Sequence, residues 1–365
     1  MHRLFPGAAA TIACVAAAAV AVAATAADPA TPAQQPASAS RAAAIITQEF
    51  MLPSADPGLR LYVRNKHPAA LHAYRAQRTL LFVHGATYPA DSSFDLRLNG
   101  LSWMDYIASH GYDVYLVDLR GYGRSTHPAA MDEPPERHAP LEDTAAAVTD
   151  VGTAVDFILR RRHLQKLDLM GWSWGTSIMG AYTAQHNDKV EKLVLYAPIW
   201  TRTAGRLLTD TGAPLGAYRT VSVAAARARW LHGVPADKQA DLIPPGWFEA
   251  WARATFPPAG NGASGRGLLR APNGVFADFR TYWNAGKPMY DPADIRVPTF
   301  LAHGEWDADA PNDMLYAVFA RLTHAPYKRY VQIGEGTHTV MMEKNRMQLF
   351  ESVQQFLDES LHPGE

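Results

Sequence analysis

Cysteine is nearly absent from this chain, because Cys14 is the only one among 365 residues. A single cysteine cannot form an intramolecular disulfide, so disulfide bonds within the chain do not stabilise the fold. A chain of this length can bury a sizeable core without them, as one large domain or two modest ones.

An excess of charge is absent as well. The chain has 34 Lys and Arg residues and 35 Asp and Glu residues, which gives a formal net charge of -1. No long-range field therefore attracts nucleic acid or an anionic membrane surface. The sequence also lacks zinc-site spacings of His, Cys and Glu, a glycine-rich phosphate loop and a dinucleotide fingerprint. We expect a small molecule as the partner, no metal and no cofactor; the oligomeric state stays open.

A long apolar run is found at the N-terminus, where Arg3 precedes a stretch rich in Ala and Val from Ala8 to Ala24. Ala24-Thr25-Ala26 is a small-x-small cleavage pattern, so residues 1–26 are expected to form a signal peptide that is cut near Ala26. A retained anchor is less favoured, because the stretch is mostly Ala and short for a span of about 20 residues. The mature chain would be secreted or periplasmic without stable membrane insertion. Cys14 would be an ordinary signal-peptide residue rather than a lipid-attachment site.

The rest of the chain alternates short apolar runs with helix-length segments, after a disordered linker expected at residues 27–47. This rhythm is typical of an α/β fold with a mostly parallel, doubly wound sheet. The expected strands are Phe50–Leu52, Leu59–Arg64, Thr79–Val83, Asp113–Asp118, Leu167–Met170, Lys192–Tyr196, Thr299–Ala302 and Arg329–Ile333. The expected helices are Trp103–Ser109, Leu141–Arg162, Thr176–His186, Asn312–Thr323 and Glu343–Leu361.

The alternation stops between residues 201 and 291, a stretch too long for a plain loop. We predict an inserted cap there, partly helical at Ala224–Leu231 and Pro245–Thr255, over the carboxyl ends of the strands. Residues 48–200 and 292–365 would form the core.

The composition of the cap favours two properties of a substrate pocket. Trp247, Trp251 and Trp283 are candidates to line an apolar pocket, although most cap aromatics are expected in the cap's own core. The cap also has eleven Lys and Arg residues against six Asp and Glu. An anionic substrate tail would fit this surplus, but the scattered positions of the arginines favour solvated side chains.

A serine between two glycines carries the main chemical signal. Gly171-Trp172-Ser173-Trp174-Gly175 follows an apolar strand and precedes a helix-length segment. A serine nucleophile needs its hydroxyl exposed at a strained strand-to-helix turn, and flanking glycines let the backbone pass closely. The helix N-terminus also offers free N–H groups to a developing oxyanion. Ser173 is therefore the predicted nucleophile.

A second loop, His84-Gly85-Ala86-Thr87, follows the strand at Thr79–Val83. Its backbone can direct an N–H toward the substrate oxygen, so the N–H groups of Ala86 and Trp174 are the predicted oxyanion hole. His84 is expected to hydrogen-bond within the loop. Thr87 and Trp172 are candidates for substrate contact, and the side chain of Trp174 is expected against the substrate.

Two further strands end in the partners that a serine nucleophile needs. Asp307 follows the strand at Thr299–Ala302, and His338 follows the last strand and a glycine-rich loop. His338 is the predicted general base, and Asp307 is the predicted carboxylate that orients it. Asp309 is the rival for the role of Asp307.

With serine, acid and histidine in this order, the chain resembles the α/β-hydrolase superfamily, in its branch of lidded esterases, lipases and prolyl aminopeptidases. The resemblance covers residue 48 to the end, cap excepted. Tyr112–Ser125, with Asp118-Leu119-Arg120-Gly121-Tyr122-Gly123 inside it, resembles a scaffold signature of the family. The resemblance implies acyl transfer, because related epoxide hydrolases and dehalogenases have Asp where this chain has Ser173.

Three functions fit these residues. A secreted carboxylesterase or lipase-like enzyme is the leading one. A prolyl-type aminopeptidase would need an acidic pair in the cap for the substrate ammonium, and Glu249 with Asp278 or Asp241 is its only support. A non-catalytic binding protein on the same fold is disfavoured, because all three catalytic positions hold competent residues.

Overall fold

The structure is a computed structural model that describes residues 44–201, 212–257 and 267–360. The predicted signal peptide with Cys14, and the linker as far as residue 43, lie outside these residues. The linker was predicted too long, because the first strand begins at Ile45. Ile45 and Ile46 are β-branched and favour extended backbone, and the antiparallel partner Pro68–His67 extends the strand to them.

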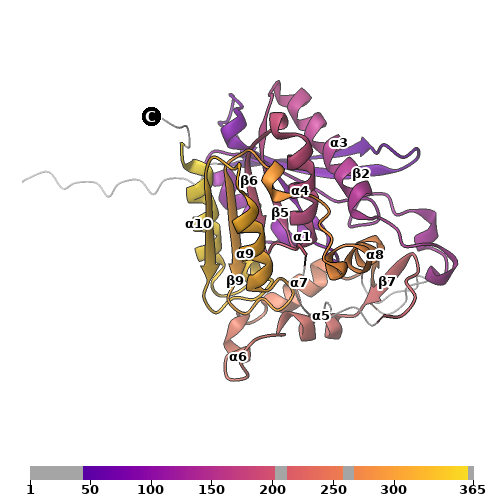
Figure 1. Ribbon diagram of the computed structural model, residues 1–365. Helices are drawn as coiled ribbons and strands as arrows, with labels where there is room; N and C mark the ends of the chain where they lie inside the picture. Colours follow the sequence, from indigo (N-terminus) through magenta and orange to yellow (C-terminus); the bar gives the residue numbers. More distant parts are fainter. Residues whose placement is uncertain (1–43, 202–211, 258–266, 361–365) are drawn as a thin grey trace, which may run out of the picture. The chain divides into compact units, whose positions relative to one another are not determined.

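An eight-stranded sheet lies at the centre of the described residues (Figure 1), in the order β1-β2-β4-β3-β5-β6-β9-β10. The strands β1 and β2 pair antiparallel, as do β2 and β4, and the other neighbours pair parallel. This arrangement confirms the predicted α/β fold class with a mostly parallel sheet. The strands are β1 Ile45–Pro53, β2 Arg60–Pro68, β3 Thr79–Val83, β4 Asp113–Val117, β5 Leu167–Trp172, β6 Val190–Tyr196, β9 Thr299–Gly304 and β10 Lys328–Ile333.

The central strands are buried along their whole length, which explains why their sequences are short apolar runs without alternation. Helices α2 and α10 pack against each other on one face, and α3 packs against α4 on the other. Trp103 of α2 stacks on Phe350 of α10 with ring centroids 4.6 Å apart. The main helices are α2 Trp103–Ser109, α3 Thr144–Arg162, α4 Trp174–Gln185, α9 Asn312–Arg321 and α10 Arg346–Asp358.

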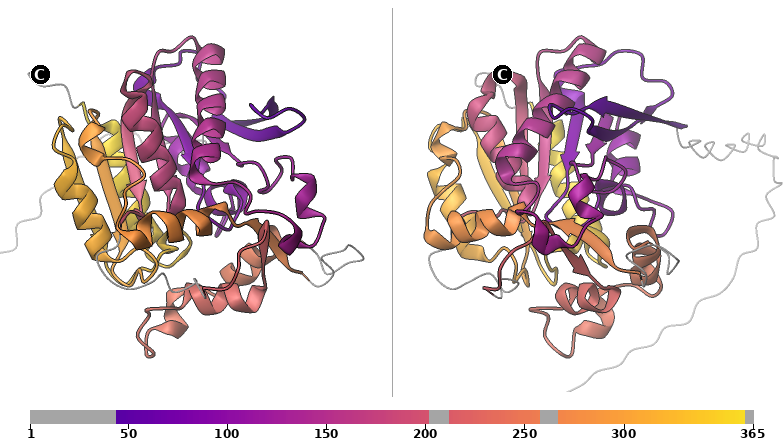
Figure 2. Two further views of the ribbon diagram at one scale, coloured as in Figure 1. Left: turned by 45° about the vertical axis from the view of Figure 1, so that its right-hand side comes forward. Right: turned by 90° about the vertical axis from the view of Figure 1, so that its right-hand side faces the viewer.

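The region predicted as a cap contains four helices and a small two-stranded sheet among its described residues. Figure 2 shows α5, α6 and α7 together at one end of the large sheet. The two helices expected from the sequence are present as α5 and α7, whereas the antiparallel pair of β7 and β8 was not predicted. Each of these strands has only four residues, too few for a recognisable alternation. The elements are β7 Tyr218–Val221, α5 Val223–Trp230, α6 Gln239–Leu242, α7 Trp247–Thr255, β8 Leu269–Pro272 and α8 Gly274–Thr281.

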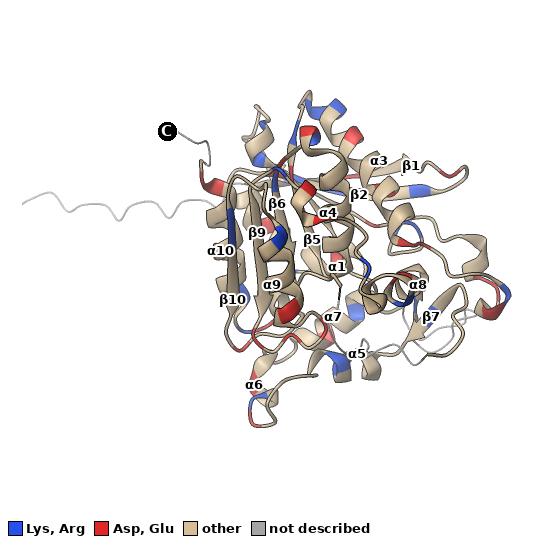
Figure 3. Ribbon diagram, in the orientation of Figure 1, with Lys and Arg blue, Asp and Glu red and all other residues tan. Residues whose placement is uncertain are grey.

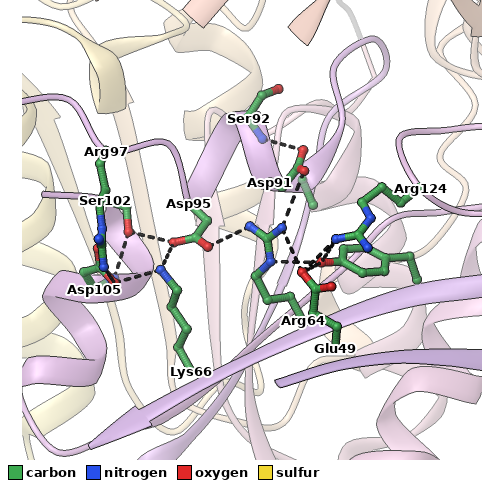
Figure 4. Close-up of polar contacts among 12 residues, drawn as sticks. Glu49, Arg64, Lys66, Asp91, Ser92, Asp95, Arg97, Ser102, Asp105 and Arg124 are labelled. Atoms are coloured by element: carbon green, nitrogen blue, oxygen red, sulfur yellow. Dashed lines mark hydrogen bonds and ion pairs between the residues drawn. The ribbon is translucent and has the colours of Figure 1, made fainter. Parts of the chain in front are cut away.

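Charges of both signs are scattered over the helices and loops (Figure 3), in keeping with the near-zero net charge. One group of charges is buried, however, between β2 and the short helix α1, Ala90–Phe94 (Figure 4). The Nζ atom of Lys66 lies 2.5 Å from Asp95 and 2.8 Å from Asp105, and Arg64 lies 2.8 Å from Asp95. These groups are stable without water only because each faces an opposite charge. The network therefore holds the segment after residue 89 onto the sheet.

Replacing Lys66 with methionine is expected to lower the free energy of unfolding by about 3 kcal/mol. Methionine keeps most of the apolar stem but leaves the buried carboxylates of Asp95 and Asp105 without their shared cation. The loss lies at the low end for a broken buried pair, because Arg64 and Arg97 still face these carboxylates. Urea unfolding followed by circular dichroism measures the change.

Lys238→Met is the matched control for this prediction. Lys238 pairs with Glu335 at 3.0 Å, but both side chains are exposed to solvent. Removing an exposed pair changes stability little. Equal losses in the two variants would contradict a special contribution of the buried network.

Candidate active site

Ser173 lies in a strained turn between β5 and α4. Its backbone has φ 58° and ψ -122°, a conformation that a residue with a side chain adopts only when its surroundings enforce it. The glycines on either side explain how. A Cβ atom at Gly171 would lie 2.1 Å from the carbonyl oxygen of Gly175, and one at Gly175 would lie 2.6 Å from that of Val83. The turn is therefore accessible only to this glycine pattern.

The loop after β3 packs directly on this turn. A Cβ atom at Gly85 would lie 3.0 Å from the Cβ atom of Ser173, so the loop backbone passes beside the serine. Trp174 is the first residue of α4, and its N–H is among those that a helix leaves without an intrahelical acceptor. Both predicted oxyanion-hole residues thus lie near Ser173. Trp174 is the next residue in the chain, and Ala86 belongs to the loop that packs on the same turn.

His84 fixes the orientation of the Ala86 peptide. The N–H of Leu119 donates to Nε2 of His84 at 3.1 Å, so Nδ1 carries the proton and donates to the carbonyl oxygen of Gly85 at 2.7 Å. Complete burial lowers the pKa of His84 to about 4, which keeps the ring neutral. The Ala86 N–H is trans to the Gly85 carbonyl in the same peptide plane, so this bond also sets the direction of the N–H. The expectation that His84 bonds within its loop agrees with this geometry.

The carbonyl of Ala86 is held from two sides. It accepts hydrogen bonds from the hydroxyl of Tyr122 at 3.0 Å and from Nη2 of Arg219 at 2.6 Å. Arg219 belongs to β7 and also donates to Thr87 Oγ1 at 2.9 Å. A residue of the β7–β8 sheet therefore helps to set the geometry of the loop beside Ser173.

His338 and Asp307 face each other from the loops after β10 and β9. Nδ1 of His338 lies 2.9 Å and 3.0 Å from the two carboxylate oxygens of Asp307. Oδ1 of Asp307 also accepts the backbone N–H groups of Asp309 at 3.0 Å and Ala310 at 2.8 Å, which fixes its orientation. Nε2 of His338 is buried and has no hydrogen-bond partner among the described residues. That nitrogen is free to take a proton.

The charge environment of His338 sets its basicity. Burial alone lowers the pKa of His338, but the carboxylates of Asp307 and Asp309 outweigh burial, and the pKa is raised above its ordinary value. The backbone is held as well, because Trp172 Nε1 and the Tyr196 hydroxyl each donate to the His338 carbonyl at 2.9 Å. The Trp172 ring lies 5.5 Å from the imidazole.

A small pocket contains both Ser173 and His338, with a cavity volume of ≈ 30 Å³. By this measure it holds about two water molecules. Of the predicted site residues, the pocket includes Ala86, Thr87 and Trp172 in addition to the serine and histidine. The full lining is Gly85, Ala86, Thr87, Tyr88, Trp172, Ser173, Ala226, Arg229, Trp230, Asp309, His338 and Thr339.

Seven lining residues were not predicted to line the pocket: Gly85, Tyr88, Ala226, Arg229, Trp230, Asp309 and Thr339. Ala226, Arg229 and Trp230 lie three and four residues apart on α5, the spacing of one helix face. That spacing is the signal that could have found Arg229 and Trp230. Composition alone gave no reason to select this face over the others.

The side chain of Trp174 does not reach the pocket, contrary to the expectation. It is fully buried behind the nucleophile, and its Nε1 donates to Thr144 Oγ1 at 2.8 Å. The turn explains the difference, because residues on either side of a nucleophile in this conformation point in different directions.

Three cap tryptophans proposed for the pocket also lie elsewhere. Trp251 is in the aromatic core of the cap, 5.1 Å from Trp230, and Trp283 packs on Phe279 at 4.6 Å. Trp247 lies under the guanidinium of Arg346 at 4.4 Å. The prediction that these three residues line the pocket is therefore wrong, because their rings pack against other parts of the protein.

Asp309, the rival of Asp307, pairs with a cap residue instead of the histidine. Its Oδ2 lies 2.8 Å from Nε of Arg229 on α5. The structure places Asp307, not Asp309, in contact with Nδ1 of His338.

The acidic residues that an aminopeptidase would need are not in the pocket. Asp278 accepts two hydrogen bonds from Thr144, at 2.7 Å and 2.6 Å, and Glu249 is exposed and 3.8 Å from Arg227. Asp241 lies on α6 and is exposed. The cap carboxylates proposed to bind an ammonium group therefore face other partners or solvent.

No group of three or more His, Cys, Asp or Glu side chains in residues 44–201, 212–257 and 267–360 is placed to hold a metal ion. Within the same residues, no helix combines the length and the apolar character needed to cross a membrane.

Comparison with known proteins identifies the fold. A model of the family described as the α/β hydrolase fold matches residues 78–345, well over half of the chain. No curated protein matches the chain in sequence.

Several solved structures share the fold. A serine hydrolase from Cycloclasticus zankles is 15% identical, with coverage of 86% of this chain and 98% of that chain and a TM-score of 0.56. A thermophilic esterase from Thermogutta terrifontis is 14% identical, with coverage of 85% and 98% and a TM-score of 0.55. An esterase from Exiguobacterium antarcticum is 17% identical, with coverage of 86% and 100% and a TM-score of 0.51. At these identities the similarity is one of fold.

Proposed function

Because this chain belongs to the α/β-hydrolase family, we propose that it is a serine hydrolase that cleaves carboxylic esters through an acyl-enzyme. One observation carries the proposal: His338 contacts Asp307 through Nδ1 and lines a pocket together with Ser173, and its Nε2 has no hydrogen-bond partner in the part of the chain that the structure describes. This is the arrangement of base, orienting acid and nucleophile that acyl transfer needs.

The proposed reaction has two steps. Nε2 of His338 removes the proton from the Ser173 hydroxyl as its oxygen attacks the acyl carbon, and the same proton passes to the departing alcohol. A water molecule then gives its proton to Nε2 and attacks the acyl-enzyme, which releases the acid and restores Ser173. Asp307 keeps Nδ1 protonated and stabilises the imidazolium in both steps.

The N–H groups of Ala86 and Trp174 are proposed to bind the oxyanion of each tetrahedral intermediate. Preorganised donors are effective because they need not reorient while charge develops. The hydrogen bonds from His84 to Gly85, and from Tyr122 and Arg219 to Ala86, support this role, since they hold the loop before substrate arrives.

Ester cleavage is favoured over prolyl aminopeptidase activity by the charges around Ser173. An aminopeptidase binds a substrate ammonium through carboxylates that are free to accept from it. Among the described residues that line the small pocket, Asp309 is the one carboxylate, and it is already paired with Arg229. The pocket therefore offers an ammonium group no free carboxylate among its described residues.

The proposal is tested by substrate panels and by labelling. We expect turnover of p-nitrophenyl esters, little or no turnover of proline p-nitroanilide, and attachment of a fluorophosphonate to the peptide that contains Ser173, located by mass spectrometry. Cleavage of the anilide with inert esters would support the aminopeptidase instead. No turnover and no labelling would support a binding protein.

The small volume beside Ser173 predicts a preference for short acyl groups. We propose that the acyl group enters this pocket and that the leaving group lies in a larger cleft of ≈ 560 Å³, which shares Thr87 with it. The kcat/KM for p-nitrophenyl acetate is then expected to exceed that for the octanoate by at least roughly 10-fold. Rates measured below KM at one enzyme concentration check this. A rising series from acetate to octanoate would show that the acyl group binds elsewhere.

A further inference from the structure

Arg229 is the cationic side chain that lines the pocket of Ser173, yet the catalytic steps above do not use it. It projects from α5, and its side chain is 30% exposed while that of Asp309 is 14% exposed. The guanidinium is thus half enclosed at the wall of the pocket, between the loop that bears Thr87 and the loop that bears Asp309.

The hydrogen bonds of Arg229 leave part of its guanidinium free. Nε donates to Asp309 at 2.8 Å, and Nη1 makes a long contact of 3.4 Å with Thr87 Oγ1. Nη2 has no acceptor among the residues that the structure describes. The donors of an arginine form a planar fork, and Nη2 is the free arm of this fork, so it is suited to donate to a carboxylate oxygen.

Asp309 does not cancel the positive charge on this side of the pocket, because a second arginine lies close by. Arg219 donates to the same Thr87 hydroxyl at 2.9 Å, and no carboxylate among the described residues forms an ion pair with it. Burial lowers the pKa of Arg219 to about 10, which still leaves it charged at neutral pH. Two guanidinium groups therefore lie beside Thr87, and among the described residues only that of Arg229 forms an ion pair, with Asp309.

We propose that Arg229 binds a carboxylate, or a similar anionic group, on the acyl part of the substrate, so that the preferred esters are short half-esters of dicarboxylic acids. This proposal rests on the proposed function and adds the class of acyl group to it. The anion approaches from the pocket and meets Nη2, while Asp309 holds Nε in place. The scattered cap arginines thus include two that are not ordinary solvated side chains.

A pair of esters of similar length tests the proposal by pH-stat titration. Monomethyl succinate carries the carboxylate, and methyl valerate replaces it with an apolar end. In the wild type, kcat/KM is expected to be higher for monomethyl succinate. In Arg229→Met the ratio of the two values is expected to fall roughly 10- to 100-fold, the effect of losing a charge-assisted hydrogen bond. Arg229→Lys is expected to retain part of the preference, because the charge remains without the fork.

Arg227→Met is the matched control on the same helix. Arg227 is exposed, lies over the ring of Phe248 at 4.8 Å, and does not line the pocket. Its loss is expected to leave the ratio unchanged. Thermal melting of each variant separates a folding defect from a change in specificity, and the ratio itself cancels a general loss of activity.

Succinate as an inhibitor supplies an independent measurement. We expect succinate to compete with p-nitrophenyl acetate more strongly than butyrate does, and to lose that advantage in Arg229→Met. A wild type that prefers methyl valerate, or a preference for monomethyl succinate that survives Arg229→Met, would overturn the inference while leaving ester cleavage intact. Failure to cleave any ester, p-nitrophenyl acetate included, would instead overturn the proposed function and this inference with it.

Discussion

Replacing Ser173 with alanine is expected to lower kcat for p-nitrophenyl acetate by about 10⁶-fold, to a level set by binding and the oxyanion hole alone. Alanine keeps the Cβ atom and adds no atom to the turn, so the close approach of the turn to Gly85 is expected to persist. Only the attacking oxygen is removed. The rate of p-nitrophenol release at saturating ester measures the loss, with the fluorophosphonate label as a second readout.

Ser177→Ala is the matched control for this prediction. Ser177 lies four residues further along α4, is also buried, and donates to the carbonyl of Ile199 at 2.7 Å. Its loss removes one hydrogen bond and is expected to reduce stability by about 1 kcal/mol with little effect on kcat. If Ser173→Ala retained a rate close to that of Ser177→Ala, another group would have to be the nucleophile.

Local sequence was sufficient to predict the strand, turn and helix around Ser173, because the whole glycine pattern lies within five consecutive residues. The two glycines at residues 171 and 175 are required by backbone atoms that lie within a few ångströms, and no other residue fits. The buried central strands were recognisable for a similar reason, since strands covered on both faces must be apolar throughout. The predicted strand Thr79–Val83 has the same bounds as β3.

The direction of side chains in the cap could not be predicted from the sequence. Trp230 and Trp251 are both apolar residues of cap helices. Trp230 lines the pocket, whereas Trp251 is enclosed by aromatic neighbours. Their difference depends on how α5 and α7 pack on each other and on the loop with Tyr88. Such contacts join residues far apart in the chain and leave no periodic pattern. The same holds for β7 and β8, which pair across about fifty residues.

The electrostatic role of single arginines was equally inaccessible. The surplus of positive charge in the cap is visible in the composition, but composition weights every arginine alike. Arg227 is exposed and Arg229 faces the pocket, although they are two residues apart on one helix. A helix turns by about 100° per residue, so neighbours two apart point to opposite sides. Only the packing of α5 decides which side meets Ser173.

Replacing Asp307 with asparagine is expected to lower kcat for p-nitrophenyl acetate by about 10⁴-fold. An amide is neutral, and its NH₂ group can meet Nδ1 of His338 only if that nitrogen gives up its proton. The imidazole would then carry its proton on Nε2, where it cannot accept one from Ser173. The backbone donors of Asp309 and Ala310 still hold the amide oxygen, so the fold is expected to persist.

The pH profile of Asp307→Asn is expected to shift in a defined direction. His338 must be neutral to act as a base, so kcat/KM is expected to rise with pH through the pKa of His338. Burial lowers this pKa, but the carboxylates of Asp307 and Asp309 outweigh burial and raise it above its ordinary value. Removing the carboxylate at residue 307 lowers that pKa, and the rising limb moves to lower pH. The pH profile of kcat/KM for p-nitrophenyl acetate measures the shift.

Asp309→Asn separates the two acids. Asp309 contributes to the raised pKa of His338 through space but contacts Arg229 and not the imidazole, so the limb is expected to move in the same direction while kcat keeps most of its value. A loss of 10⁴-fold in Asp309→Asn together with an active Asp307→Asn would assign the orienting role to Asp309. The expected order of the two losses follows from one distance, the 2.9 Å between Nδ1 of His338 and Asp307.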